Sequence, residues 1–240
     1  MKLPISEIHN VDCMEYMKNI PDRLFDLAIV DPPYGINISN RNGSIGQKKG
    51  QGKITKYSKK SWDSQRPYKE YFDELFRVSK NQIIFGANYF SDFLPPSKGW
   101  IVWDKRQPEG VTFAMAELAF TSIDKSVKIF SCDRSLIQNC VSNNEKLAHK
   151  YSKIHPAQKP ILLYAWILKN YANSGDRIFD SHLGSGSSRI AAYKLGYDFY
   201  GCEIDKEYFD NQEKRFREEC FGEIRFPNGR VVKQLNLFEN

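Results

Sequence analysis

The feature that most constrains this chain is an apolar run, residues 27–30, that ends abruptly in Asp31-Pro32-Pro33-Tyr34. Such a run is typical of a central parallel strand that is covered on both faces. The strand must stop at the two prolines, because each proline fixes its own φ and lacks a backbone donor. The pattern therefore predicts a rigid elbow at the carboxyl end of a strand, where α/β folds bind their ligands.

This elbow presents a carboxylate, a backbone carbonyl and an aromatic ring to one small volume. Asp31 and the carbonyl of Pro32 can each accept an N–H bond from an exocyclic amino group on a heteroaromatic ring. Tyr34 can stack on the plane of that ring, a contact worth roughly 1–3 kcal/mol per base in nucleic-acid sites. The predicted catalytic residues are Asp31, Pro32, Pro33 and Tyr34. The alternative is a strand-ending Pro-Pro turn with a surface tyrosine.

The composition is that of a globular protein. With 240 residues, of which 41% are hydrophobic and 27% charged, we expect a single domain over residues 1–240 with a modest insertion. There is no apolar run of about 18 residues and no apolar segment after Met1, so we expect neither a membrane span nor a secretory signal. The five cysteines lack metal-ligand spacing, which favours reduced thiols in the cytoplasm and no metal site.

The positive charge is concentrated in one segment. Residues 35–66 hold eight lysines and arginines against Asp63, a net charge of +7, whereas the whole chain carries +6. The segment is rich in glycine and serine and follows the elbow directly, so we predict a mobile basic loop that closes over a polyanion such as DNA. The alternative is a solvated, flexible insertion. The predicted DNA-binding residues are Arg41, Lys48, Lys49, Lys53, Lys56, Lys59 and Lys60.

A second constellation lies later in the chain. Residues 177–180 predict a strand, residues 181–188 a glycine-rich turn, and the residues that follow a helix. Such a turn lets the backbone approach a nucleotide cofactor at a helix N-terminus. An acid that ends the following strand, as Glu203 does, suits a ribose diol. The predicted cofactor-binding residues of this region are Asp180, His182, Gly184, Ser185, Gly186, Ser187 and Glu203. A dehydrogenase-like dinucleotide site is disfavoured, because Arg189 stands where the third glycine of that fingerprint belongs.

Taken together, these motifs resemble those of the β-class DNA adenine-N6 methyltransferases, which use S-adenosylmethionine. The elbow is similar to the family's catalytic motif, residues 155–160 to its His-Pro-x-x-Lys-Pro segment, and residues 180–187 to its Asp-Pro-Phe-x-Gly-Ser-Gly-Thr loop. The catalytic motif precedes the cofactor loop, which is the family's circularly permuted order. The resemblance implies an α/β, Rossmann-like fold with a mostly parallel, seven-stranded sheet and helices on both faces.

The resemblance also implies further cofactor-binding residues, namely Asp12, Cys13, Asp31, Lys159 and Pro160. Asp12 can instead cap a helix that begins after it, since aspartate is favoured at that position, and both roles can hold at once. The chain departs from the family pattern at Ser181, His182 and Ser187. His182 replaces an aromatic residue that is expected to border the cofactor, and its ring can still do so.

The implied reaction is methyl transfer to N6 of an adenine that is flipped out of double-stranded DNA, as in restriction-modification systems. The family frequently forms dimers, so a homodimer is possible. Aspartate at position 31 favours adenine, because cytosine-N4 relatives usually carry serine there. A cytosine-N4 or RNA amino-methyltransferase, and a catalytically silent DNA-binding relative, remain as alternatives.

Two segments invite narrower hypotheses. Residues 124–154 lack a strong period and carry several lysines, so they are a candidate insertion for recognising the target sequence, although a plain surface excursion fits nearly as well. Residues 222–240 form a C-terminal tail that contains Gln234-Leu235-Asn236-Leu237-Phe238. This pentapeptide resembles those that dock on the bacterial sliding clamp; the alternative is a tail that folds back on its own domain.

Overall fold

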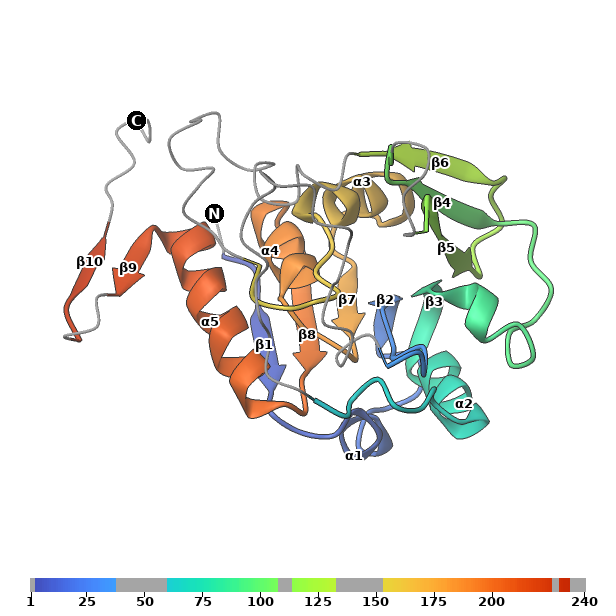
Figure 1. Ribbon diagram of the computed structural model, residues 1–240, viewed down its shortest axis with the longest axis horizontal. Helices are drawn as coiled ribbons and strands as arrows, with labels where there is room; N and C mark the ends of the chain where they lie inside the picture. The colour runs from blue at the N-terminus through green and yellow to red at the C-terminus, as the bar shows by residue number, and fades with distance from the viewer. Residues whose placement is uncertain (1–2, 38–59, 108–113, 133–152, 226–228, 234–240) are drawn as a thin grey trace, which may run out of the picture.

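The computed structural model describes residues 3–37, 60–107, 114–132, 153–225 and 229–233. In chain order its elements are β1 Ser6–His9, α1 Cys13–Lys18, β2 Phe25–Val30, α2 Lys69–Val78, β3 Ser79–Phe85, the 3-10 helix η2 Ala87–Tyr89, β4 Trp100–Asp104, β5 Ala116–Thr121, β6 Lys128–Ser131, α3 Ile161–Tyr171, β7 Arg177–Asp180, α4 Ser187–Lys194, β8 Asp198–Cys202, α5 Lys206–Phe221, β9 Glu223–Arg225 and β10 Val231–Lys233 (Figure 1). No helix within those ranges is both long and apolar enough to cross a bilayer.

Eight strands form one sheet in the order β1-β8-β7-β2-β3-β5-β4-β6. The pairs from β1 to β3 are parallel, β5 runs antiparallel to both β3 and β4, and β6 is parallel to β4. The predicted α/β class and mostly parallel sheet are therefore confirmed. The strand count is eight instead of the expected seven, because residues 128–131 of the expected insertion extend the sheet at its edge.

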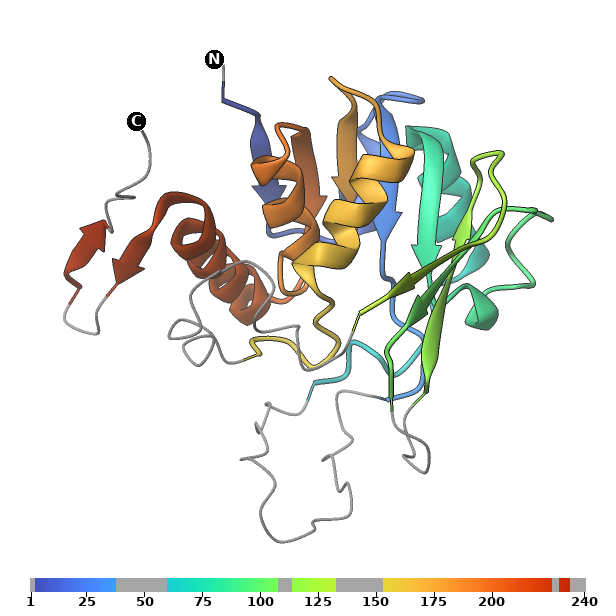
Figure 2. The same cartoon turned by 90° about the horizontal axis from the view of Figure 1, so that it is seen from above.

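Alternate residues of β2 divide the core into two layers. Leu27 and Ile29 pack with the buried side of α3, α4 and α5, whereas Ala28 and Val30 pack with α1 and α2 on the other face. Figure 2 shows α3 and α4, in yellow and orange, on one side of the strands and teal α2 on the other. Because both faces of β2 are covered, nearly the whole strand must be apolar, which explains the run that the sequence displays.

The sheet brings the two constellations together. β2 and β7 are neighbouring parallel strands, with Leu27 opposite Ile178 and Ala28 opposite Phe179. Parallel strands end at the same edge of a sheet, so the elbow after β2 lies beside the glycine-rich turn after β7. β8 is the next strand along, and Glu203 follows its last residue. This edge is the place where the fold can build a site.

Two sequence-based hypotheses concern the N-terminal and C-terminal parts of the chain. β1 ends at His9, and Asp12 is the N-cap of α1. Its carboxylate accepts N–H bonds from Met14 at 2.8 Å and from Glu15 at 3.3 Å, which confirms the capping interpretation. The C-terminal segment contains an antiparallel hairpin of β9 and β10, while the pentapeptide 234–238 lies outside the described residues.

Candidate active site

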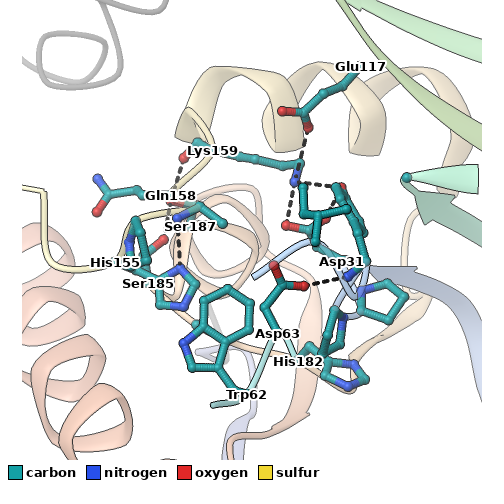
Figure 3. A pocket seen from close by; sticks show the side chains of 18 of the residues that line it. Asp31, Trp62, Asp63, Glu117, His155, Gln158, Lys159, His182, Ser185 and Ser187 are labelled. Carbon is teal, nitrogen blue, oxygen red and sulfur yellow. Dashed lines mark hydrogen bonds and ion pairs between the residues drawn. The ribbon is translucent and has the colours of Figure 1, made fainter. Parts of the chain in front are cut away.

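A cavity of about 700 Å³ opens at the carboxyl ends of β2, β7 and β8. Figure 3 shows side chains from the elbow, from the segment before α3 and from the glycine-rich turn converging on it. Its volume lies in the range of small-molecule sites, roughly 300–1,000 Å³. Of the predicted site residues, those that line it are Asp31, Pro32, Pro33, Tyr34, Lys159, His182, Gly184, Ser185, Ser187 and Glu203.

The elbow holds its catalytic candidates by contacts within the chain. Tyr34 Oη donates to Asp31 Oδ1 at 2.5 Å, and the Lys159 ammonium forms an ion pair with Asp31 Oδ2. The Tyr34 ring stacks on Tyr89, with 4.9 Å between centroids, and lies over Gly86. A Cβ at Gly86 would be 2.1 Å from Tyr34 Cε1, and its φ of +68° also favours glycine. The ring is therefore packed against Tyr89 and Gly86 at the edge of the cavity.

Asp63 is a site residue that the sequence analysis did not single out. It is 1% exposed, and its Oδ1 accepts the N–H groups of Tyr34 at 2.8 Å and of Gly35 at 2.9 Å. The carboxylate thus fixes the backbone immediately after the two prolines, which themselves lack donors. The one available signal was that Asp63 is the sole acid in a strongly basic segment.

Two more charged residues of the site, Glu117 of β5 and Lys105 after β4, were also missed. Glu117 lies between two ammonium groups, 2.6 Å from Lys105 Nζ and 3.2 Å from Lys159 Nζ. Burial disfavours its ionisation, but Lys159 and Lys105 outweigh that cost and lower the pKa of Glu117 to about 2. Burial raises the pKa of Asp31, with Lys159 opposing the shift and Glu117 adding to it. The site therefore contains a connected group of two acids and two lysines.

Side chains of neighbouring elements form hydrogen bonds to the backbone of the glycine-rich turn and hold it in place. Gly184 and Gly186 have φ values of +50° and +70°, which favour glycine. Glu203 accepts the Gly184 N–H at 2.8 Å on Oε2 and the Asp205 N–H at 2.9 Å on Oε1. Arg215 of α5, which is also buried, donates to the carbonyl of Ser185 at 2.7 Å. The turn is preorganised before any ligand arrives.

Asp180 also supports this turn through hydrogen bonds. Its Oδ1 accepts the His182 N–H at 3.0 Å, and its Oδ2 accepts the Ser188 hydroxyl at 2.5 Å. Burial raises the pKa of Asp180 to about 7, and these hydrogen bonds oppose that shift. The described part of the chain thus places Asp180 as a support of the turn, outside the cavity lining.

Four other predicted cofactor residues, all of them described, also lie outside the cavity lining: Asp12, Cys13, Pro160 and Gly186. Asp12 caps α1, Pro160 is the N-cap residue of α3, and Gly186 is that of α4. Cys13 is near the site, since its Sγ lies 4.0 Å from His182 Nε2. His182 itself lines the cavity, as expected of the residue that replaces an aromatic.

Among the predicted DNA-binding residues, Lys60 is the one within the described ranges; Arg41, Lys48, Lys49, Lys53, Lys56 and Lys59 lie outside them. Lys60 Nζ forms ion pairs with Asp205 and Glu207, each at 2.8 Å. This contact ties the returning end of the basic segment to the start of α5. Residues 133–152 of the candidate target-recognition insertion are likewise outside the described part. Within the described chain, no group of His, Cys, Asp and Glu has the arrangement of a metal site.

Comparison with known proteins identifies the family. The model of a family described as DNA methylase (N6_N4_Mtase) matches residues 94–214, just over half of the chain. The chain belongs to this DNA methylase family. The methylase is 23% identical to the Type II methyltransferase M1.MboII of Moraxella bovis, over 86% of this chain and 94% of that protein. It is 26% identical to the Type II methyltransferase M.HpaI of Haemophilus parainfluenzae, over 88% of this chain and 74% of that protein.

Solved structures agree on the fold. The M1.HpyAVI–SAM complex superposes with a TM-score of 0.53 at 23% identity, covering 87% of the methylase and 98% of that chain. PvuII DNA methyltransferase, described as cytosine-N4-specific, gives a TM-score of 0.57 at 14% identity, covering 89% and 87%. The Rossmann-like methyltransferase fold expected from the sequence is therefore confirmed. The expected function of a site-specific DNA methyltransferase is confirmed by the family match and the Type II relatives.

The methylase uses S-adenosylmethionine, and the residues present fit that cofactor. The turn at Gly184 and Gly186 keeps its backbone at positive φ beside the cavity, and the buried carboxylate of Glu203 faces the same space. Each carboxylate oxygen has a second lone pair besides the one that accepts a backbone N–H. Ribose hydroxyl groups are donors that such an acid can bind. The cofactor supplies the methyl group.

Protonation of His182 should make the methylase sensitive to acid. Burial lowers the pKa of His182 from 6.5 to about 4, so the unfolded chain binds this proton at a higher pH than the folded chain. Stability from this group is complete above pH 6.5 and is lost as the pH falls toward 4. We expect His182→Phe to reduce the loss of unfolding free energy between pH 7 and pH 5 by about 1–2 kcal/mol in urea titrations. An unchanged pH dependence would contradict this account.

The Asp63 contacts predict a second effect on stability. Asp63→Ala leaves the N–H groups of Tyr34 and Gly35 without their acceptor and should lower the free energy of unfolding by about 1–3 kcal/mol. Asp63→Asn keeps an oxygen acceptor and should cost less than half as much. Asp73→Ala is the matched control, because that acid is exposed on α2, and it should change stability by less than about 0.5 kcal/mol. Equal losses of unfolding free energy for Asp63→Ala and Asp73→Ala would show that the Asp63 hydrogen bonds do not stabilise the elbow.

Proposed function

We propose that the methylase transfers the methyl group to N6 of adenine and that Asp31, Pro32, Pro33 and Tyr34 are its catalytic residues. The observation that supports this assignment is the position of the Asp31 carboxylate, at the junction of the elbow and the cofactor turn within one cavity. Its carboxylate and the Pro32 carbonyl can each accept one N–H of the target amine. These bonds favour a tetrahedral nitrogen with an available lone pair. As the N–C bond forms and the S–C bond of the methyl donor breaks, the nitrogen becomes cationic. It then releases its extra proton to the Asp31 carboxylate or to water, so no base is needed beforehand.

Adenine is favoured over cytosine by the residue at position 31. A carboxylate accepts hydrogen bonds more strongly than a serine hydroxyl does. The family includes both N6 and N4 enzymes, and the cytosine-N4-specific PvuII enzyme has the same fold. The fold therefore does not distinguish the two bases, and the assignment to adenine depends on the family resemblance at position 31. Methylation of cytosine N4 is the second candidate.

The target base must leave the duplex to reach Asp31, which costs a few kcal/mol. We propose that the basic segment offsets this cost through phosphate contacts of Arg41, Lys48, Lys49, Lys53, Lys56, Lys59 and Lys60. Such contacts would make DNA binding strongly dependent on salt. For Lys60, a phosphate contact requires that its ammonium be shared with, or released from, Asp205 and Glu207. Residues 124–154 stay the candidate for reading the target sequence.

Three narrower proposals concern partners and location. A homodimer is proposed from the family resemblance, and docking on a sliding clamp from the sequence Gln234-Leu235-Asn236-Leu237-Phe238. A reducing, cytoplasmic location is supported by the cysteine pattern and by the thiols of Cys13 and Cys202. Burial raises the pKa of the Cys13 thiol to about 12, which disfavours the reactive thiolate.

The decisive experiment is methyl transfer from labelled S-adenosylmethionine to unmethylated DNA of varied sequence, followed by nucleoside analysis. We expect label in N6-methyladenine for the wild-type protein and a loss of at least about 100-fold in Asp31→Ala, since the substitution removes one of the two N–H acceptors for the target amine. Asp73→Ala should retain the wild-type rate. Label in N4-methylcytosine would overturn the base assignment. An absence of label despite DNA and cofactor binding would favour the silent relative.

A further inference from the structure

The carboxylate of Asp31 is already occupied in this structure. Its Oδ1 accepts from Tyr34, and its Oδ2 faces the Lys159 ammonium, which is 4% exposed. A buried ammonium attracts a carboxylate far more strongly than a neutral amino group does, because the surroundings screen the charges poorly. An incoming target amine must therefore compete with Lys159 for the same oxygen, unless Lys159 has somewhere else to go.

Glu117 offers that alternative. The Lys159 ammonium lies 3.2 Å from Glu117 Oε2, so it stands between two carboxylates (Figure 3). Glu117 Oε2 is buried and accepts no hydrogen bond with good geometry within the described chain, although it is within ion-pair distance of Lys159. The Lys159 ammonium is therefore shared between Asp31 and Glu117, and its contact with Glu117 is the longer of the two. A small shift of the ammonium would complete that bond.

The rest of the group keeps Glu117 in place. Lys105 Nζ binds the other oxygen, Oε1, at 2.6 Å. Glu117 and Trp103 are opposite each other in the antiparallel pair of β4 and β5, which puts Glu117 on a rigid element and brings Lys105 beside it. The two acids and two lysines sum to zero charge, so moving the ammonium from Asp31 to Glu117 leaves the neutrality of the site unchanged.

We propose that Glu117 is a positioning residue that takes over the Lys159 ammonium when the target amine binds Asp31. The inference rests on the proposed function and adds residues to it: Lys159 keeps the buried Asp31 ionised in the free enzyme, and Glu117 lets Lys159 withdraw during the reaction. Without the charge of Glu117, Lys159 stays on Asp31 and the amine is held poorly. Lys105 contributes by fixing Glu117.

The test compares single-turnover methyl transfer at saturating DNA and cofactor in four proteins: wild type, Glu117→Gln, Lys159→Met and the double variant. We expect Glu117→Gln to slow transfer by about tenfold or more, while the concentration of cofactor at half-maximal rate changes less than about threefold. Since Glu117 acts through Lys159, the double variant should be no slower than Lys159→Met alone. Glu117→Asp, which restores the charge, should recover part of the rate, and Asp73→Asn should match wild type.

Several results would overturn the inference. A Glu117→Gln protein as fast as wild type would remove the role of Glu117, and multiplied losses in the double variant would show that Glu117 acts independently of Lys159. Thermal melting of each variant shows whether a loss of rate comes from unfolding. If Glu117→Gln is destabilised, the rate of a Glu117→Asp protein that melts at the wild-type temperature decides the question. A wild-type protein that transfers no methyl to adenine would instead defeat the proposed function, and this inference with it.

Discussion

The backbone hydrogen bonds between β2 and β7 join two segments that lie far apart in the chain, and the site depends on them. They place the elbow after Val30 next to the turn after Asp180, at one edge of the sheet. The order of the motifs along the chain therefore matters less than the order of the strands in space. A catalytic motif that precedes the cofactor turn still meets it, provided that the two parallel strands are neighbours.

The acids at this edge of the sheet have different kinds of partner: some accept hydrogen bonds from backbone and hydroxyl groups, and another pairs with a lysine side chain. Asp180 accepts a backbone N–H and a hydroxyl, and it supports the turn from beneath. Glu203 accepts two backbone N–H groups and keeps lone pairs toward the cavity. Asp31, which we propose accepts bonds from the substrate, is instead paired with the side chain of Lys159. A mobile cation suits an acid whose oxygens must become available, whereas backbone donors suit acids that stay where they are.

Sequence reasoning succeeded where the signal is local. The apolar run before Asp31, the prolines and the glycines of the cofactor turn each impose a backbone conformation on their own neighbourhood, and the fold has the elements they predict. Asp63, Lys105 and Glu117 reach the site only through tertiary structure, and apart from Asp63 being the sole acid of a basic segment no local pattern marks them. β6 was missed because an edge strand that is largely exposed needs no apolar run. For Asp12, capping of a helix was one of two interpretations of the sequence, and the residues around Asp12 already supported it.

The central claim is that the turn after β7 and the acid after β8 form one cofactor site with the elbow. Calorimetric titration of S-adenosylhomocysteine into the wild-type protein and into Glu203→Gln tests it most directly, because binding is measured without DNA or turnover. Glutamine keeps the shape of Glu203 but loses its charge and one acceptor. We expect one site in the wild type and binding at least about fivefold weaker in Glu203→Gln, together with a lower melting temperature, because the amide nitrogen cannot accept one of the two backbone N–H groups that Glu203 binds. Equal affinity in the two proteins would contradict the account.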